Sequence, residues 1–259
     1  MTRSQANALC KKHIAALDSV SEAIAQLIES GQYAVAETAT EEVKDMALSQ
    51  NSLLDWQDVD SYDISDLSGV ASNGEAVSTL LNDVVAVHKS NIENALATSD
   101  DAYILAVLNG IRMNGFNQFE NVIRNEMLHA SRSGAMLAYA KNASSVVGYK
   151  RVCSADTKTS AVCWGLHGVV SPVTQHPHVH VRCRCVSVPV VEGSVETDIP
   201  SAEQLFSNLT PDERKSTLGK ARYEFWESGI PLSSFARTYI DDTWGSVVEL
   251  TPINDLAGL

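Results

Sequence analysis

The amino-acid sequence predicts an α+β protein with a helical N-terminal domain, a small mixed α/β core whose β region is rich in cysteine and histidine, and a helical C-terminal tail. Three observations lead to this prediction. Apolar residues recur at helical spacing through most of the first 143 residues, short β-type runs follow up to about residue 190, and a helix-start signal stands at 210–213. The corresponding segments are 1–104, 105–190 and 191–259.

The N-terminal domain is expected to be a set of helices. Apolar residues three or four apart predict a first helix and, after a break expected at Gly31, a second helix that runs to Met46. Residues 50–75 are rich in Asp, Ser, Asn and Gly, whose side chains bond the local backbone, so they predict a long loop. Helical spacing resumes at Val77, and the Ser-Asp-Asp cap signal at 99–101 predicts a further helix start.

The core is expected to begin with another helix, from Phe116 to about Ala143, before the pattern changes. The runs VVGYKRV, GVVSPV and RCRCVSVPV alternate or are rich in β-branched residues, which predicts short strands. A linker is expected at 191–200. The tail then carries a Thr-Pro-Asp-Glu helix start at 210–213 and a glycine stop at Gly229, and we expect it to be a separate small element.

The charge of the chain is unevenly distributed. The net charge of −13 divides into −12 for residues 1–110, +3 for 111–198 and −4 for 199–259. Because sequence-independent binding of nucleic acid relies on Lys and Arg, this balance argues against a DNA-coating protein and leaves only the middle segment to face DNA. No apolar run approaches the roughly 20 residues that span a bilayer, and we expect neither a membrane partner nor a signal peptide.

Four of the five cysteines lie close together in the middle segment, with histidines among them. Cys183 and Cys185 alternate in a strand-like run, which would place both thiols on one face. Cys163 and His167 are four apart, so one helical turn would bring their side chains together. Two such pairs would supply the four ligands of a closed, tetrahedral zinc site of the structural type.

His180 competes with His167 for the fourth position. It lies three residues before Cys183 and would need a turn at Val181 and Arg182 to reach the same point, so spacing alone slightly favours His167. The competing interpretation of the whole group is a set of reduced, buried cysteines with exposed histidines and no metal. Cys10 stands apart and is expected to be an ordinary helix residue.

The segment SADTKTSAVCWGLHGVVSPV, followed by HPHVHVRCRC, resembles the signature of the phage Mu F-like head morphogenesis family of minor head proteins. That signature is an Asp-x-x-Thr-x-x-x-Cys-x-x-Leu-x-Gly segment with a later His-x-x-Cys-Arg-Cys ending. The positions that match it are Asp156, Thr159, Cys163, Leu166, Gly168, His180, Cys183, Arg184 and Cys185. Upstream, Arg124 and Glu126 match the family's Arg-Thr-Glu helix, with Asn125 where Thr is usual. The resemblance covers about residues 105–190, the expected Mu F-like core.

The resemblance implies a bacteriophage minor head (minor capsid) protein, not an enzyme, that works in head morphogenesis at the portal vertex or in the head interior. It implies assistance in viral assembly, DNA packaging or DNA ejection. The implied partners are the portal protein and the major capsid or scaffolding protein, with at most weak contact with packaged DNA. The implied location is the virion head, with the host cytoplasm during assembly. The family pattern also favours Cys163, His180, Cys183 and Cys185 as the zinc ligands, with His167 in reserve.

Two other hypotheses remain open from the sequence. A metal-dependent nuclease or toxin-like effector enzyme on the same domain could use the alternate histidines His176, His178 and His180 with Glu126. The second hypothesis concerns Arg184, which could pair with DNA phosphate together with Arg182. In the competing interpretation Arg184 anchors the core through a carboxylate such as that of Asp156 or Glu126.

Overall fold

A computed structural model of the chain describes residues 3–98, 100–177, 180, 182–194, 199–241 and 245–258. The chain forms two compact units, the first made of residues 1–38 and 60–134 and the second of residues 39–59 and 135–259. Long helices and small antiparallel sheets make it a mixed helix-and-strand protein. The units cut across the segments 1–104, 105–190 and 191–259, because α1 (Arg3–Gln50) and α4 (Asp101–Lys141) contribute to both. As folding domains, those segments stay a prediction.

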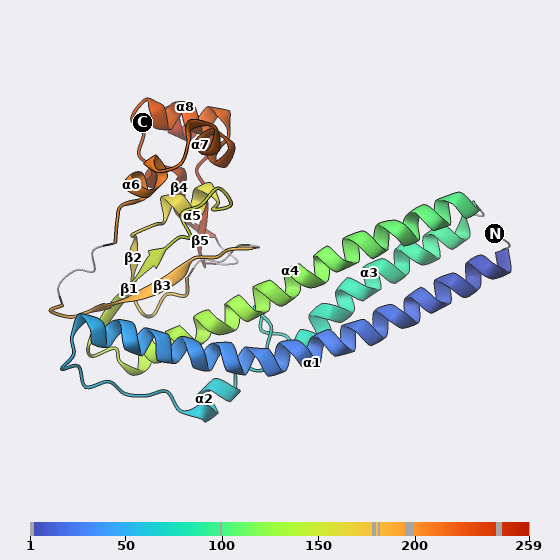
Figure 1. The fold of residues 1–259 in the computed structure, drawn as a ribbon, viewed down its shortest axis with the longest axis horizontal. Coiled ribbons are helices and arrows are strands. Elements are labelled where there is room, and N and C mark those ends of the chain that lie inside the picture. Colours follow the sequence, from blue (N-terminus) through green and yellow to red (C-terminus); the bar gives the residue numbers. More distant parts are fainter. Residues whose placement is uncertain are drawn as a thin grey trace. The chain divides into compact units, whose positions relative to one another are not determined.

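The first unit is a bundle of α1, α3 (Val77–Ala97) and α4, which run side by side in Figure 1. Two apolar clusters hold these helices together, and Cys10 is buried in one of them as an ordinary core residue. The expected loop at 50–75 is confirmed in outline, since the only helix in this segment is the short α2 (Ser61–Ser65). The clusters consist of Ala6, Cys10, Ile92, Ala95, Ile104, Leu108 and Ile111, and of Ala25, Ile28, Ala71, Val77, Leu81, Val85 and Phe119.

The expected break at Gly31 is wrong, because α1 continues through it without interruption. A Cβ atom at Gly31 would overlap the terminal methyl of Met127 on α4. At Gly134, a Cβ atom would overlap the backbone carbonyl of Ala36 on α1. Both glycines therefore serve close approach of two helices, which is the alternative use of a glycine inside a helical pattern.

Helix α4 begins where the acidic cap signal predicts. The carboxylate of Asp100 accepts hydrogen bonds from the backbone N–H groups of Ala102 (2.9 Å) and Tyr103 (3.3 Å), which are otherwise unsatisfied at a helix start. Ser99, the first residue of that signal, lies outside the described residues. The separate helix expected from Phe116 does not begin there, because Phe116 lies in the middle of the 41-residue α4.

The second unit contains an antiparallel sheet with the order β2-β1-β3, formed by β1 (Val146–Val152), β2 (Val170–Ser171) and β3 (Val186–Val191). The sheet packs on the apolar end of α4, where Tyr139 stacks on Tyr149. The Tyr139 hydroxyl donates to the carbonyl of Ser187 (2.9 Å), which ties β3 to the helix. All three β-type runs of the sequence thus contribute strands, although β2 is only two residues long.

The C-terminal tail differs from the prediction in two respects. Besides α6 (Ala202–Ser207), α7 (Pro211–Leu218), α8 (Lys220–Glu227), η1 (Leu232–Phe235) and α9 (Ile253–Leu256), it holds a hairpin of β4 (Ala236–Asp241) and β5 (Gly245–Leu250), so it is not purely helical. The predicted helix start at Thr210 is confirmed by a full capping box with Glu213.

The tail is also not a separate element, because it packs on α5 (Ala161–Gly165) of the core. A Cβ atom at Gly165 would lie 2.8 Å from the Cβ of Ala236 and 2.9 Å from the carbonyl oxygen of Leu232. The buried Trp164 meets Phe206 edge to face, with ring centroids 5.0 Å apart. The tail therefore holds α5, and with it Cys163, in place.

Candidate metal centre

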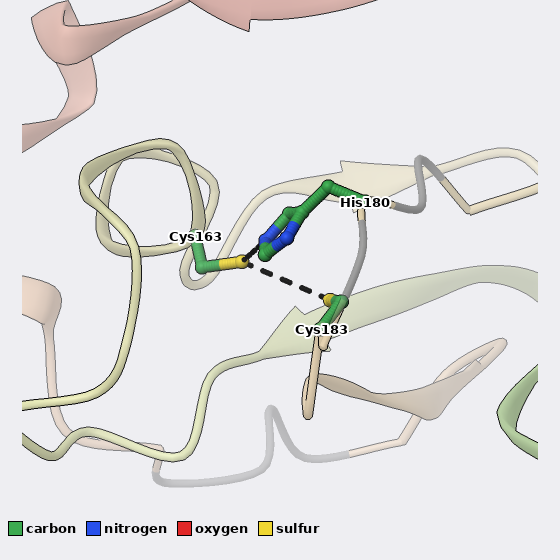
Figure 2. A group of neighbouring side chains, drawn as sticks. All are labelled: Cys163, His180 and Cys183. Atoms are coloured by element: carbon green, nitrogen blue, oxygen red, sulfur yellow. Dashed lines mark hydrogen bonds between the residues drawn. The ribbon is translucent and has the colours of Figure 1, made fainter. Parts of the chain in front are cut away.

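Cys163 lies on α5, and Ser160 sets the start of that helix. The Ser160 hydroxyl accepts a hydrogen bond from the backbone N–H of Cys163 (3.2 Å), which is the usual role of an N-cap serine. The other two side chains of the centre come from the segment before β3. Figure 2 shows the thiols of Cys163 and Cys183 directed toward each other beside the imidazole of His180.

A turn brings His180 to the two cysteines. The backbone N–H of Cys183 donates to the carbonyl of His180 (3.0 Å), and Arg182 has a positive φ of 61°. These two features form the turn that His180 was predicted to need in order to reach the cysteines. Val181, the other residue of the predicted turn, lies outside the described residues. The expected strand through Cys183 and Cys185 is wrong, since β3 begins only at Val186, but both thiols are nevertheless buried.

The distances within the cluster suit a small metal ion. The ligand atoms of Cys163, His180 and Cys183 all lie within 4.8 Å of one another. The two sulfur atoms are 3.8 Å apart, and about 3.8 Å is the edge of a tetrahedron with zinc–sulfur bonds of about 2.3 Å. The Cys163 sulfur lies 2.9 Å from His180 Nε2, which is a hydrogen-bond length and shorter than the roughly 3.6 Å edge expected around zinc. This cluster could therefore hold a metal ion after a small outward shift of the imidazole.

Cys185 is the fourth residue of the predicted set. Its thiol is hydrogen-bonded to the thiols of Cys163 and Cys183, and these contacts, with burial, raise the pKa of Cys185. For Cys163, the contact with Cys183 opposes ionisation, but hydrogen bonds from Cys185, His180 and Ser160 outweigh it and lower the pKa of Cys163. Cys163 therefore ionises more readily than Cys185.

Arg151 is the residue of this centre that sequence reasoning missed. It lies near the end of β1 with only 5% of its surface exposed, and its Nη2 lies 3.3 Å from the Cys183 sulfur and 3.6 Å from that of Cys163. Burial alone would lower the pKa of Arg151, but the charges of Cys185, Cys183 and Cys163 raise it overall. A buried guanidinium is stabilised by a negative partner, and the sulfur atoms of Cys163 and Cys183 would supply one as thiolates. No local pattern in VVGYKRV distinguishes this arginine from an exposed one.

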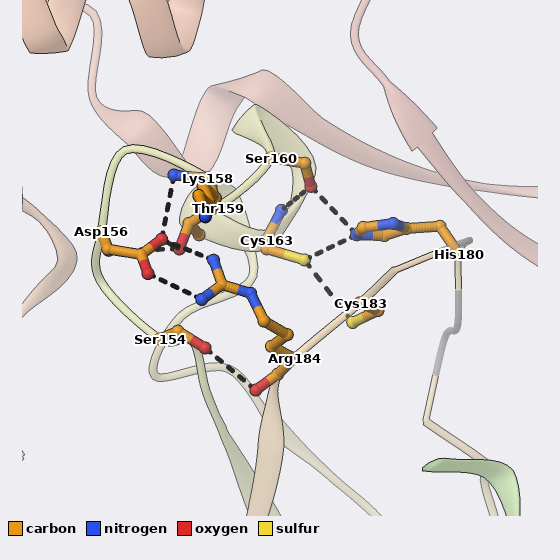
Figure 3. Close-up of polar contacts among 9 residues, drawn as sticks. All are labelled: Ser154, Asp156, Lys158, Thr159, Ser160, Cys163, His180, Cys183 and Arg184. Carbon is orange, nitrogen blue, oxygen red and sulfur yellow. Dashed lines mark hydrogen bonds and ion pairs between the residues drawn. The ribbon is translucent and has the colours of Figure 1, made fainter. Parts of the chain in front are cut away.

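A second group of contacts closes the loop around the cluster (Figure 3). The Arg184 guanidinium donates to both carboxylate oxygens of Asp156, at 2.7 and 2.5 Å, and this pairing holds the pKa of Asp156 well below its usual range. Thr159 also donates to Asp156 (3.2 Å). The hypothesis that Arg184 anchors the core through Asp156 is therefore confirmed.

His167 is held elsewhere. Its Nδ1 accepts a hydrogen bond from the backbone N–H of Cys153 (3.2 Å), so its Nε2 carries the proton and donates to the carbonyl of Pro200 (3.0 Å). Both ring nitrogens are thus engaged in fixing the backbone, and the preference for His167 that spacing suggested is wrong. Burial raises the pKa of Cys153 to about 11, which leaves it a neutral thiol outside the cluster.

Of the three alternate histidines, the two that the structure describes do not lie on the strand that an open metal site would need. His176 and His180 lie in irregular chain, and His178 lies outside the described residues. Glu126, the carboxylate assigned to that site, is buried in the first unit, where it accepts hydrogen bonds from the backbone N–H (2.6 Å) and hydroxyl (2.9 Å) of Ser72. Within the described part of the chain, Cys163, His180 and Cys183 are the only group of three with metal-ligand geometry.

The free space at the cluster is very small. The cavity that Cys163, His180 and Cys183 line together with neighbouring residues has a volume of about 10 Å³, roughly enough for one water molecule. Such a space admits an ion and excludes a substrate. Two buried thiols beside so small a cavity are typical of a structural metal ion and not of a site that binds a substrate.

Comparison with known proteins yields no relative: no protein-family model, no curated protein and no solved structure matches the chain. None of the helices in the described residues has the length and apolar character needed to cross a membrane.

Proposed function

We propose that Cys163, His180, Cys183 and Cys185 bind a structural zinc ion, and that the chain is a minor head protein of a tailed bacteriophage. The observation that carries the metal proposal is the convergence of three ligand atoms from two separate segments beside the buried Arg151. Thiolate and imidazole are the ligands that zinc prefers in closed, four-coordinate sites.

Charge balance supports this ligand set. Zinc with three thiolates and one neutral imidazole carries a net charge of −1, and the guanidinium of Arg151 supplies a charge of +1 at hydrogen-bonding distance from two of the sulfurs. Hydrogen bonds to metal-bound sulfur stabilise the thiolate form and orient the ligand. The buried arginine thus fits an anionic zinc centre better than a set of neutral thiols.

The phage proposal rests on the ordered signature, and the contacts among the signature residues support treating it as one structural element. Asp156 pairs with Arg184, Thr159 bonds Asp156, and Cys163 contacts Cys183. In addition, Gly168 adopts a positive φ of 81°, which favours glycine. Residues that are spread along the sequence therefore contact one another in a single loop structure, as expected if the signature describes one structural element.

In this role the protein would act in head morphogenesis, at the portal vertex or inside the head, and would assist assembly, DNA packaging or DNA ejection. Its partners would be the portal protein and the major capsid or scaffolding protein. A DNA contact would be weak, because the guanidinium of Arg184 is already paired with Asp156. We expect any DNA binding by the purified chain to disappear by about 200 mM salt in a titration, and binding that persists unchanged would contradict this.

Elemental analysis of untagged protein tests the metal proposal. We expect about one zinc per chain, retained through dialysis, and loss of the metal in Cys163→Ser and Cys183→Ser. Cys153→Ser is the matched control, because this buried cysteine lies outside the cluster and its replacement should leave the zinc content unchanged. Less than about 0.2 zinc per wild-type chain would contradict the metal proposal.

Crosslinking and mass spectrometry of purified particles test the phage proposal. We expect a few copies per particle, with crosslinks to the portal protein or the major capsid protein, in proheads and in full heads. Loss of the chain from particles that have released their DNA would add a role in ejection. Absence from every kind of particle would contradict the proposal and favour an enzyme or effector on the same domain, for which metal-dependent nicking of plasmid DNA is the corresponding assay.

A further inference from the structure

The first unit carries an apolar hollow between α1 and α4 that the proposed function does not use. Its volume is about 590 Å³, several times that of a single side chain. The walls are almost entirely apolar, although charged residues are among those that line it. The residues that line it are His13, Ala16, Leu17, Val20, Ile24, Ile111, Arg112, Gly115, Phe116, Phe119, Glu120, Ile123 and Arg124.

The lining residues follow the spacing of a helix-packing seam on both walls. Successive positions are four, three and four residues apart on each helix, so each wall is a straight stripe parallel to its helix axis. A groove between two such stripes accepts a third helix that lies along it. The stripes are His13, Leu17, Val20 and Ile24 on α1, and Arg112, Phe116, Phe119 and Ile123 on α4.

Large apolar side chains are exposed in this hollow and next to it on α4. Phe116 is 77% exposed, and Met113, one turn away on α4, is 66% exposed. Val20 on the opposite wall is 45% exposed. Exposed aromatic residues next to an apolar hollow are typical of an interaction surface, because both the projection and the hollow are buried when a complementary helix docks.

We propose that this surface binds a second copy of the chain, with the two α4 helices antiparallel and Phe116 at the two-fold axis. In an antiparallel pair, residues at equal distances on either side of the axis face each other. Arg112 lies four residues before Phe116 and Glu120 four residues after it. Arg112 of each copy therefore faces Glu120 of the other, and Met113 faces Phe119.

The charges favour a second copy over an unrelated helix. Glu120 already holds Arg124 of its own helix at 2.8 Å, in an exposed pair where the carboxylate can accept another donor. Arg112 forms no ion pair with any residue that the structure describes, so its charge is available at the edge of the hollow. A symmetric arrangement pairs Arg112 with Glu120, an acid from the same helix of the other copy, and the two Phe116 side chains are buried against each other at the axis.

Sedimentation or light scattering over a range of concentrations tests the proposal on the full chain. We expect a monomer–dimer equilibrium for the wild type and, for Phe116→Glu, a dissociation constant at least about tenfold higher, since two buried aromatic anchors are lost. Leu53→Glu is the matched control, because Leu53 is 92% exposed and lies far along the chain from this surface, so this variant should dimerise like the wild type.

Charge reversal tests the geometry of the pair. Arg112→Glu should weaken the dimer, because it places two acids opposite each other, and the double variant with Arg112→Glu and Glu120→Arg should restore it. Unchanged circular dichroism and zinc content in every variant would show that the fold is intact. A strictly monomeric wild type, a dimer indifferent to Phe116→Glu, or no rescue by the double variant would each overturn the proposal. None of these outcomes bears on the zinc centre or on the phage role.

Discussion

Replacing Arg151 with methionine separates a metal-bound cluster from a set of reduced thiols, because the two alternatives predict different losses of stability. The side chain is buried and lies at hydrogen-bonding distance from the sulfur atoms of Cys183 and Cys163. Methionine has a similar length and no charge, so it removes the electrostatic contribution with little change in packing.

With zinc bound to three thiolates, the variant would leave a buried net charge of −1 that Arg151 no longer balances. Removing one partner of a buried ion pair costs about 3 to 5 kcal/mol. We expect about 3 kcal/mol, the lower end, because hydrogen bonds from neighbouring donors remain. With neutral thiols and no metal, the cluster would carry no charge for Arg151 to balance, and the variant should cost less than about 1 kcal/mol.

Tryptophan fluorescence during urea unfolding is the suitable assay. All four tryptophans of the sequence fall in the residue ranges of the second unit, so the signal reports the unit that holds the cluster; they are Trp56, Trp164, Trp226 and Trp244. This selectivity matters because a chain of two units need not unfold in one step. Arg151→Lys is the matched control, since it retains the positive charge and should lose less stability than Arg151→Met.

The result that would refute this reasoning is a small loss for Arg151→Met in protein that contains one zinc per chain. In that case the charge of the centre would be balanced by another group, and the role assigned to Arg151 would be wrong. A large loss in protein without zinc would instead indicate that the buried arginine is held by thiolates alone.

Two further predictions concern the loop around the cluster and the packing of the helices. Asp156→Asn removes the two-fold hydrogen-bonded ion pair with Arg184, which is about half exposed. We therefore expect the free energy of unfolding to fall by only about 0.5 to 1 kcal/mol in urea unfolding at pH 7. Because pairing lowers the pKa of Asp156, this contribution to stability is present above the unfolded-state pKa of about 3.9 and is lost as the pH falls below that value. The unfolding free energies of variant and wild type should therefore converge in acid. A difference that stays constant with pH would contradict the ion pair. Gly134→Ala should destabilise the helices by about 2 kcal/mol in thermal circular dichroism, since its Cβ would overlap the Ala36 carbonyl. Gly110→Ala in the same helix is the control: its Cβ would meet no other atom, so it should stabilise the helices by about 0.5 kcal/mol. Equal effects of the two alanines would rule out the close helix contact.

Local signals predicted where elements begin, and distant contacts explain where those predictions failed. Asp100 and Thr210 start helices because a side chain within three residues bonds the exposed N–H groups, and such a contact can be inferred from the sequence itself. Gly31 was expected to break α1, whereas it packs against Met127, a residue far along the chain. A glycine in a helical pattern permits either outcome, and only the partner decides between them.

The candidate centre was predictable in its residue types but not in its full geometry. Spacing paired Cys163 with His167, yet the backbone N–H of Cys153 needs an acceptor, and His167 provides it. The family pattern favoured His180, and the structure brings His180 to Cys163 through a turn that alternation in the sequence does not reveal. Arg151 could not be identified, because burial of a charged strand residue depends on what covers the strand.

The loop between β1 and β3 explains why a crosslink would matter in this fold. Among the described residues from Cys153 to Cys185, the regular structure consists only of α5 and β2. Side-chain hydrogen bonds therefore replace the usual backbone ladders, as where Ser154 donates to the carbonyl of Arg184 (3.1 Å). Such exposed contacts contribute little individually. A metal bridging Cys163 and Cys183 would close a loop of 20 residues, and by the arithmetic of a covalent crosslink this removes about 3 kcal/mol of unfolded-state entropy. That gain is several times larger than the contribution of the Asp156 ion pair. The cysteine and histidine positions of the signature, more than its aspartate and arginine, should therefore determine whether this loop folds.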